Sequence, residues 1–505
     1  MKPIEVHDIT IKKAPISISA FLTEALTSQI LENVHPVNFD MVLLPGFVQW
    51  DSTYLENHYS IKIRKGPEFA SDLPLILKNL GQVNLSNTLP ANRLIEISGE
   101  DTYHNAVKEQ LELAKNQIGN HTYYISEKKS ELIIGRNLPP PIIAEIVNCT
   151  QKTNDNILTK VKYYIESGAD IIDIGCVSNK PNPDRIREII SLIRSKYDIL
   201  LSIDSMQVQE LNAATEEGID LILSLDLGNY KEFMNLTKDI PIVILPTNLN
   251  KAYFPRKPEV RVKNLLKLTK ILQDHGFKKL IADPLLETPI RPGISNSLET
   301  YFLYKKQVKQ EKYKKLELPL FFGISNVVEL MDIDSVGING LLASIAIELD
   351  MGILFTVEHS TKLIGGVREL KESIKLNYLA KYKQTPPINQ GISVFKAKGK
   401  TSQRFPNIDI SESFLVDQSI REYSPDEKGY FRIYTNNYNM KIYVLFYSNE
   451  HEIIDTFIGE NAEAISKTVI NRNLTRDPYH LNYLGRELKK AEICLFLGKP
   501  YIQDE

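Results

Sequence analysis

Short apolar runs recur through the middle of the chain, separated by longer segments that mix apolar and charged residues. Each run is rich in Ile, Leu or Val and does not alternate apolar with polar positions. Uninterrupted runs of this kind are typical of strands covered on both faces, as in parallel sheets. The eight predicted strands are residues 142–148, 169–175, 199–205, 220–226, 241–247, 279–284, 318–325 and 353–359.

The segments between these runs predict helices. Residues 156–167 and 261–275, for example, carry apolar side chains at helical spacing and charges elsewhere. Strand and helix therefore alternate about eight times, over a span close to the roughly 250 residues of a (β/α)₈ barrel. We predict such an α/β TIM barrel over residues 140–383. A doubly wound open sheet is the alternative, since the pattern does not show whether the sheet closes.

The chain extends on both sides of this span. Residues 1–136 carry shorter strand and helix patterns, which predict an N-terminal α/β domain that ends before the three prolines at 139–141. After a proline pair at 386–387, residues 390–505 predict a small α+β domain that contains a hairpin over residues 429–447. The sequence assigns no role to either flanking domain.

Composition and charge narrow the class of protein. The chain has 505 residues, 24% of them charged, and a net charge of −3. This balance gives no reason to expect nucleic-acid or membrane partners, and no apolar run is long enough to span a bilayer. The three cysteines have no paired spacing, which argues against a disulfide framework and a zinc-thiolate site. We expect a soluble cytoplasmic protein. A homodimer is possible, and the sequence leaves this question open.

Polar side chains stand where the predicted strands end. Barrel active sites lie at this end, because the following loops meet there. A single Asp at a strand end is often only the N-cap of the next helix. Several carboxylates around one rim are harder to explain in this way, because like charges repel unless a ligand or cation shares them. The candidates are Asn148, Thr150, Asp173, Asp204, Ser224, Asp226, Asp283, Ser325, Asn326 and His359.

These strand ends also carry a family resemblance. Residues 148–150, 168–175, 202–205, 282–284 and 323–326 read NCT, GADIIDIG, SIDS, ADP and GISN. In this order they resemble the pterin-binding barrel shared by dihydropteroate synthases and pterin-dependent methyltransferases. With its two extensions, the chain most resembles the archaeal dihydropteroate synthase-related proteins.

The resemblance implies roles for the carboxylates and their neighbours. Asp204 and Asp283 correspond to the two carboxylates that grip the aminopyrimidine edge of the pterin, where each can accept two hydrogen bonds at once. Ser224 or Asp226 stands where the family has an Asn that contacts the pterin, and Asp226 is the preferred candidate. Asp173 corresponds to a position usually buried against the strand floor.

The resemblance also implies where the anionic end of a substrate binds. Asn148, with Thr150 beside it, corresponds to the Asn that holds Mg²⁺ and pyrophosphate in the synthases. The synthases' Arg-x-His after the last strand, which binds pyrophosphate, is reduced here to His359. Lys180 and Arg291 are the remaining candidate cations for a phosphate group, although a Lys lacks the fork of a guanidinium.

A second departure concerns the seventh strand. Ser325, Asn326 and Val327 replace the synthases' Ser-Arg-Lys, in which the Lys reaches the pterin and the Arg reaches the aryl acid. The Ser-Asn form is the one that the methyltransferase branch shows, with the Asn contacting the pterin. The resemblance therefore supports pterin binding more strongly than it supports one reaction.

Two functions remain open. The first is a transferase that condenses 6-hydroxymethyl-dihydropterin pyrophosphate with an arylamine, either 4-aminobenzoate or its ribofuranosyl phosphate derivative, in folate or tetrahydromethanopterin biosynthesis with Mg²⁺. The alternative is a pterin-dependent methyltransferase or a non-catalytic pterin-binding protein. We place the first ahead because Asn148 and Thr150 preserve the synthases' Asn-x-Thr. Nothing in the chain resembles a corrinoid site.

Overall fold

The computed structural model describes the chain except for residues 1–7, 79, 81–82, 95–98, 128, 179, 393, 395–425, 498–500 and 505. Position 179, within the segment that carries Lys180, is therefore outside the described residues. The chain forms two compact units, residues 1–108 with 375–392, and residues 109–374 with 393–505. None of the helices in the described part of the chain has the length and apolarity needed to cross a membrane.

The first unit contains a two-stranded parallel sheet. Strand β1 (Met41–Leu44) pairs with β2 (Lys62–Lys65), and the connection between them contains α2 (Thr53–Tyr59). Helices α1 (Glu24–Glu32) and α3 (Leu73–Lys78) complete the α/β pattern that the sequence predicts. Alternate strand residues, together with Leu31 and Leu55, form its apolar core. Helix α4 (Gly99–Lys115) crosses from this unit into the second.

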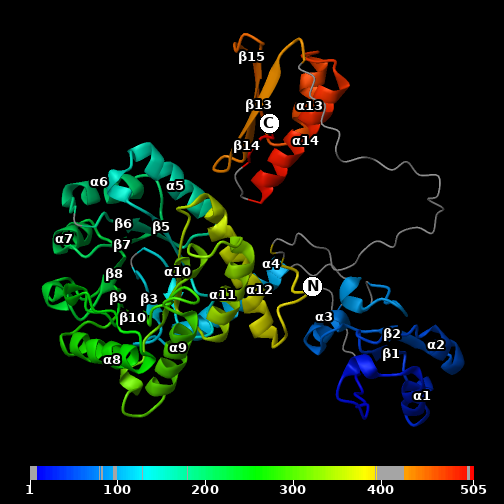
Figure 1. Cartoon of the computed structure of the whole chain (residues 1–505). Coiled ribbons are helices and arrows are strands. Elements are labelled where there is room, and N and C mark those ends of the chain that lie inside the picture. The colour runs from blue at the N-terminus through cyan, green and yellow to red at the C-terminus, as the bar shows by residue number, and fades with distance from the viewer. Residues whose placement is uncertain are drawn as a thin grey trace. The chain divides into compact units, whose positions relative to one another are not determined.

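The second unit is built on eight parallel strands. Figure 1 shows this sheet inside a ring of helices. The strand order is β10-β9-β8-β7-β6-β5-β12-β11, and a parallel bridge between Ala282 and Leu320 joins the two ends of that order. The sheet therefore closes, and the predicted barrel is confirmed over the open-sheet alternative. Its strands are β5 (Ile142–Ile146), β6 (Ile171–Gly175), β7 (Leu200–Asp204), β8 (Leu221–Leu225), β9 (Ile242–Ile244), β10 (Leu280–Ala282), β11 (Phe321–Gly323) and β12 (Ile353–Val357).

Helices follow the strands and cover the outside of the barrel (Figure 1). Their apolar faces pack inward. In α6, for instance, the four isoleucines on one face are all buried. This amphipathic spacing is what a helix over a parallel sheet needs. The helices are α5 (Asn154–Glu166), α6 (Pro183–Arg194), α7 (Val208–Glu216), α8 (Pro258–Asp274), α9 (Ile294–Val308), α10 (Ser325–Val328), α11 (Ser335–Glu348) and α12 (Gly366–Lys383).

A short hairpin seals the amino-terminal end of the barrel. Strands β3 (Tyr123–Tyr124) and β4 (Ile133–Ile134) pair antiparallel, and Tyr123, Ile125 and Ile134 share one apolar cluster with the first interior residues of the barrel strands. The Tyr123 hydroxyl also donates to the Leu280 carbonyl at 2.9 Å. The predicted domain limits near residues 136 and 390 stay predictions, but residues 109–136 lie in the unit that contains the barrel.

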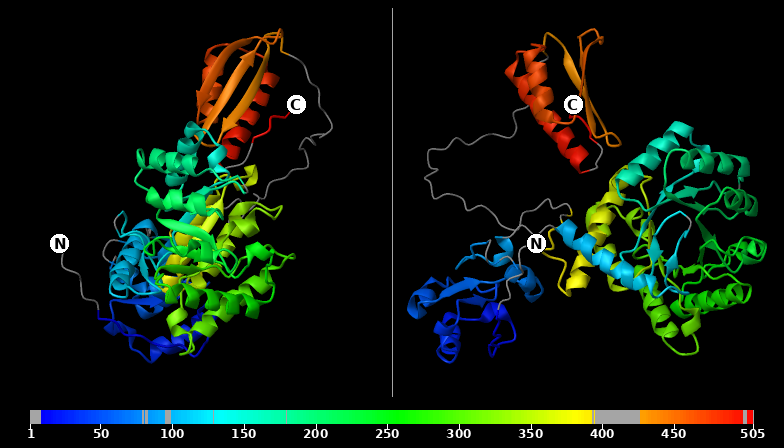
Figure 2. Two further views of the ribbon diagram at one scale, coloured as in Figure 1. Left: turned by 90° about the vertical axis from the view of Figure 1, so that its left-hand side faces the viewer. Right: turned by 180° about the vertical axis from the view of Figure 1, so that it is seen from behind.

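The C-terminal residues form a three-stranded antiparallel sheet and two helices. The left panel of Figure 2 shows the helices on one face of the sheet. Strands β13 (Tyr430–Asn436), β14 (Lys441–Tyr447) and β15 (Ile453–Gly459) precede α13 (Ala462–Asn471) and α14 (Pro478–Phe496). Alternate strand residues and the helices' apolar faces form a separate core. The predicted hairpin is confirmed, since β13 and β14 pair directly.

Candidate functional site

On β5, β6, β7 and β10 the barrel interior changes from apolar to polar in one step along the strand. Its floor is a ring of apolar residues, among them Ile143, Ile171, Leu200 and Ile281. Side chains two positions apart on a strand share a face, so the next interior residues are those two positions later. They are Glu145, Asp173, Ser202 and Asp283. The strand pattern alone therefore directs polar and acidic groups into the barrel mouth.

Three acidic groups, Glu145, Asp173 and Asp204, lie on the neighbouring strands β5, β6 and β7. Glu145 on β5 is the Cα partner of Asp173 on β6, which in turn pairs with Ser202 on β7. The Ser202 hydroxyl donates to Asp173 Oδ1 at 2.6 Å, and Asp204 follows one layer closer to the mouth. Burial and the neighbouring carboxylates raise the pKa of Glu145 to about 7 and raise the pKa of Asp173. Burial also raises the pKa of Asp204, and a hydrogen bond from Ser224 opposes that shift.

Ser224 belongs to this group, whereas Asp226 does not. The Ser224 hydroxyl hydrogen-bonds to Asp204, and its backbone has φ 71° where β8 departs from regular pairing with β9. Asp226 is fully buried, and its two carboxylate oxygens accept four hydrogen bonds from the loops after β8 and β9. Asp226 therefore fixes those loops, and Ser224 is the better placed of the two for ligand contact.

Asp283 lies at the end of β10 and is also buried. Its Oδ1 accepts the Leu285 N–H at 2.8 Å and lies 3.5 Å from the Tyr301 hydroxyl. Burial raises the pKa of Asp283 to about 7, although these donors and the charge of Arg261 oppose the shift. Arg261 is 1% exposed and holds the following loop through an ion pair with Glu287.

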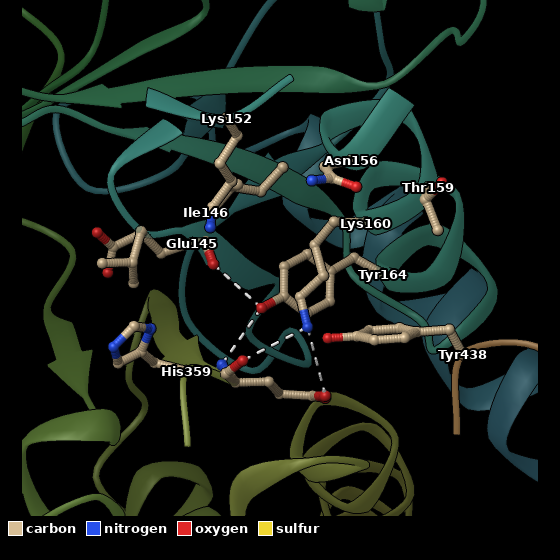
Figure 3. A pocket seen from close by; sticks show the side chains of 11 residues that line it. Glu145, Ile146, Lys152, Asn156, Thr159, Lys160, Tyr164, His359 and Tyr438 are labelled. Atoms are coloured by element: carbon tan, nitrogen blue, oxygen red, sulfur yellow. Dashed lines mark hydrogen bonds and ion pairs between the residues drawn. The ribbon is translucent and has the colours of Figure 1, made fainter. Parts of the chain in front are cut away.

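A pocket of about 350 Å³ opens beside the ends of β5 and β12, and Figure 3 shows its side chains. Glu145 lies on one side of it, and His359 enters from the end of β12. Helix α5 and the segment before it supply two lysines, Lys152 and Lys160. Its barrel residues are Glu145, Ile146, Val147, Lys152, Asn156, Thr159, Lys160, Tyr164, Glu358 and His359.

Lys160 is held in place by aromatic rings and by Glu358. Its Nζ lies 4.5 Å from the Tyr164 ring centroid and 4.0 Å from Glu358 Oε2. Burial lowers the pKa of Lys160, and the Glu358 carboxylate opposes that change. Glu358 in turn accepts hydrogen bonds from the Tyr163 hydroxyl and the Val367 N–H, which ties the end of β12 to the start of α12. Lys160 is thus a preorganised cation in the pocket wall.

The other predicted residues divide between the mouth and the outer surface. Asn148 and Thr150 follow β5 directly, and Asn148 is exposed. Ser325 is buried at the start of α10, and the Asn326 amide donates to the Leu286 carbonyl at 3.0 Å, which links the loops after β10 and β11. The two predicted phosphate cations are exposed and do not line the described pocket; they are Lys180 and Arg291.

Sequence reasoning missed Glu145 and Lys160. Glu145 lies inside a predicted strand, two residues after Ile143, and counting positions from the floor would have directed it into the mouth. Lys160 is one of the charged residues of the predicted helix over residues 156–167, and contacts with the Tyr163 and Tyr164 rings and with Glu358 place it at the pocket. No signal in the sequence indicates that the Lys160 side chain lines the pocket.

The cysteines and acidic groups also bear on which metals the site suits. Burial raises the pKa of Cys149 to about 12 and raises that of Cys176 further, so both thiols stay protonated near neutral pH. Among the described residues, no group of three His, Cys, Asp or Glu side chains has the geometry of a metal site. Mg²⁺ needs only one or two protein oxygens when a phosphate group supplies the rest. The exposed Asn148 carboxamide fits that limited role.

Two family models match the chain. The model described as "Pterin binding enzyme" matches residues 147–343, and the model PterinBD-DUF4346 matches residues 425–504. Uncharacterized protein MJ0107 of Methanocaldococcus jannaschii is 33% identical over 98% of this chain and 94% of its own length. The chain belongs to the dihydropteroate synthase-related, pterin-binding family. The family that the sequence predicts is therefore confirmed, and the family binds small-molecule pterins.

Members named for a reaction match the chain over shorter stretches or at lower identity. The dihydropteroate synthase of Streptococcus pyogenes is 31% identical over 20% of this chain and 42% of its own length. The crystal structure of the Yersinia pestis dihydropteroate synthase is 17% identical, with a TM-score of 0.39, and covers 50% of this chain and 97% of that chain. Such synthases are transferases.

Proposed function

We propose that this protein condenses 6-hydroxymethyl-dihydropterin pyrophosphate with an arylamine, as a dihydropteroate synthase does. One observation carries the proposal: a pocket containing Lys152, Lys160 and His359 lies beside the carboxyl ends of β5 and β12 and shares Glu145 with the cluster of buried carboxylates. A pyrophosphate ester brings several negative charges that need such cations. A methylated pterin brings no comparable group at its reacting end, so the two lysines of the pocket favour the condensation.

In this reaction, the chain's own residues hold the two ends of the pterin substrate. Asp204 and Asp283 accept hydrogen bonds from the ring N–H and amino groups, which orients the ring in the mouth. Lys160 and His359 stabilise the departing pyrophosphate. The methylene C–O bond breaks with its electrons going to pyrophosphate, the amine nitrogen forms the new C–N bond, and the amine loses one proton to solvent. The site supplies positioning and charge stabilisation.

Mg²⁺ belongs to this proposal. The Asn148 carboxamide oxygen would hold the ion together with oxygens of the pyrophosphate, as a hard cation with few protein ligands allows. When bound, Mg²⁺ neutralises charge on the leaving group. The amine enters from the side of the mouth that the loops after β10 and β11 border, where the Asn326 amide links the two loops.

A second function is favoured by one specific observation. Asn326 stands where synthases carry an Arg and where methyltransferases carry an Asn that contacts the pterin. A pterin-dependent methyl transfer, or pterin binding without catalysis, would use the same carboxylates and leave the basic pocket without a pyrophosphate to bind. The two functions therefore differ in whether Lys160 matters.

The test uses the full chain with Mg²⁺, 6-hydroxymethyl-dihydropterin pyrophosphate and either 4-aminobenzoate or its ribofuranosyl phosphate derivative. We expect pyrophosphate release that depends on one amine and a product whose mass is that of 6-hydroxymethyl-dihydropterin plus that amine minus one water. Lys160→Met should lower turnover at least 10-fold and leave binding of unphosphorylated 6-hydroxymethyl-dihydropterin unchanged. Lys162→Met is the matched control, because Lys162 is on the same helix and 65% exposed.

The outcome separates the two functions. If the unphosphorylated pterin binds but neither amine gives product, the condensation is wrong and methyl transfer or carriage replaces it. If product forms equally well with Lys160→Met, the condensation stands and the pocket is not the pyrophosphate site.

A further inference from the structure

Glu145 fills space that a glycine leaves free. On β6, Gly175 is the Cα partner of Asp204, one layer nearer the mouth than the row of Glu145 and Asp173. A Cβ on Gly175 would overlap the Glu145 Oε1 atom and would lie 3.1 Å from its Cδ. The Glu145 side chain therefore extends from its own layer across Gly175 toward the layer of Asp204. The pair Glu145 and Gly175 brings an additional carboxyl group to the site.

The acidic cluster is not neutralised by the groups around it. Asp173 is 0% exposed; Ser202 bonds its Oδ1, and no described residue donates to its Oδ2. The carboxylates that face Glu145 are Asp173 on β6, Asp204 on β7 and Glu329 after α10. Lys152, Lys160 and His359 line the same pocket. The Tyr164 hydroxyl donates to the backbone carbonyl of Glu145. Three carboxylates this close cannot all be ionised in a buried site.

The pocket distinguishes the members of the cluster. Glu145 lines the pocket, whereas Asp173 lies one layer below Asp204 and is fully buried. Under the proposed function, Asp204 must be ionised to accept hydrogen bonds from the N–H groups of the ring. The proton that the cluster retains then has to be on another member, and Glu145 is the member that can exchange it through the pocket.

We propose that Glu145 is the proton-carrying group of the pterin site, which takes up a proton from solvent when a neutral aminopyrimidine ring binds to ionised Asp204. The inference rests on the proposed pterin binding and goes beyond it, because it assigns a role to Glu145, which lies outside the motifs that carry the resemblance described in the sequence analysis. No covalent step is involved: one proton enters with the ligand and leaves with it.

The pH dependence follows from the direction of linkage. In the free protein the pKa of Glu145 is raised to about 7, so the group is neutral below this pH and ionised above it. The charge of Asp204 already contributes to this value. A ring bound in the mouth excludes water from the cluster, and this further burial favours neutral Glu145 and raises its pKa again. Binding therefore takes up roughly 0.7 proton at pH 7.5, and affinity falls by up to roughly 20-fold between pH 6.5 and 8.5.

The experiment is calorimetric titration of the full chain with 6-hydroxymethyl-7,8-dihydropterin, which lacks the pyrophosphate. Titrations at pH 7.5 in HEPES and in Tris, whose ionisation enthalpies differ, give the number of protons taken up. Dissociation constants at pH 6.5 and 8.5 give the pH dependence. Glu145→Gln should bind the pterin with no proton uptake and with equal affinity at the two pH values. The ionisation of the pterin itself cancels in the comparison with wild type.

Two further variants sharpen the test. Gly175→Ala leaves Glu145 in the sequence but places a methyl group where its carboxyl group lies, and only the flexible end of that side chain has to move far. It should reduce proton uptake as Glu145→Gln does. Glu166→Gln, which changes a 60% exposed carboxylate on the outer helix α5, should match wild type.

Each result decides the inference. Proton uptake in Glu145→Gln equal to that of wild type would assign the proton to another group and overturn the proposal, while the pterin site itself would stand. No pterin binding by wild type at either pH would overturn the proposed function and this inference with it.

Discussion

Replacing Asp283 by Asn tests the carboxylate that ends β10. The substitution keeps the shape of the side chain and removes its charge. The Asn carbonyl oxygen can still accept the Leu285 N–H, which contacts Asp283 Oδ1 at 2.8 Å, and it can still face the Tyr301 hydroxyl at 3.5 Å. We therefore expect the barrel to fold as in wild type, without the cost of burying a charge at high pH.

The loss of ligand affinity should be large. An ionised carboxylate that accepts two hydrogen bonds from a ring N–H and an amine gains about 1.5–3 kcal/mol from each. The Asn amide would present a donor to those donors, so about 3–6 kcal/mol is lost, which corresponds to at least roughly 100-fold in the dissociation constant. The comparison belongs at pH 8, because the pKa of Asp283 is raised to about 7 and the wild-type group is mostly ionised there.

The assay is calorimetric or fluorescence titration with 6-hydroxymethyl-7,8-dihydropterin at pH 8, with a thermal melt of each variant. Asp184→Asn is the matched control, since Asp184 is 90% exposed on α6 and undergoes the same change of charge. If Asp283→Asn binds the pterin within threefold of wild type, Asp283 does not hold the ring, and the assignment of this mouth as the pterin site is wrong.

Three further predictions concern stability. Asp226→Ala leaves four buried donors without their acceptor, and we expect a loss of about 3–5 kcal/mol in barrel stability, seen as a lower thermal midpoint; an unchanged midpoint would contradict its role in fixing the loops. Because Glu145 and Asp283 have pKa values raised to about 7, the stability they contribute is complete below their ordinary pKa values near 4 and is lost as pH rises through 7. Wild type should therefore melt at a lower temperature at pH 8.5 than at pH 6, and Glu145→Gln should show a smaller difference; equal differences would exclude Glu145 as a source. Tyr123→Phe removes the hydrogen bond to the Leu280 carbonyl and should cost about 1–2 kcal/mol, measured by urea unfolding of the barrel, whereas no change would mean that the bond adds nothing to the floor.

The fold could be predicted because the barrel strands are covered on both faces. Such strands need uninterrupted Ile, Leu and Val, and those runs stand out in the sequence without any knowledge of pairing. Closure could not be predicted, because it depends on one bridge between Ala282 and Leu320 at the strand ends. Neither residue has a chemical property that distinguishes a closed sheet from an open one.

Site residues could be predicted only where they stand at the carboxyl end of a predicted strand. Asp204 and Asp283 were found because each follows an apolar run, and the structure puts both at the mouth. Asp226 has the same sequence context, yet the backbone turn at Ser224 directs its carboxylate into the loops. The direction of a side chain after a strand depends on one or two backbone torsions, which composition and spacing do not specify.

The hairpin of β3 and β4 has a consequence for dividing this chain into parts. Its side chains complete the apolar cluster at the base of the barrel. In the sequence, however, they come before the three prolines at 139–141, which directly precede β5. A fragment that starts at those prolines would expose Ile143, Ile171 and Leu200 to water at its base and would be prone to aggregate. A soluble fragment of the barrel therefore has to begin before Tyr123. The start of α4 is a better boundary than residue 109, where the second unit begins, because a cut at 109 would divide that helix.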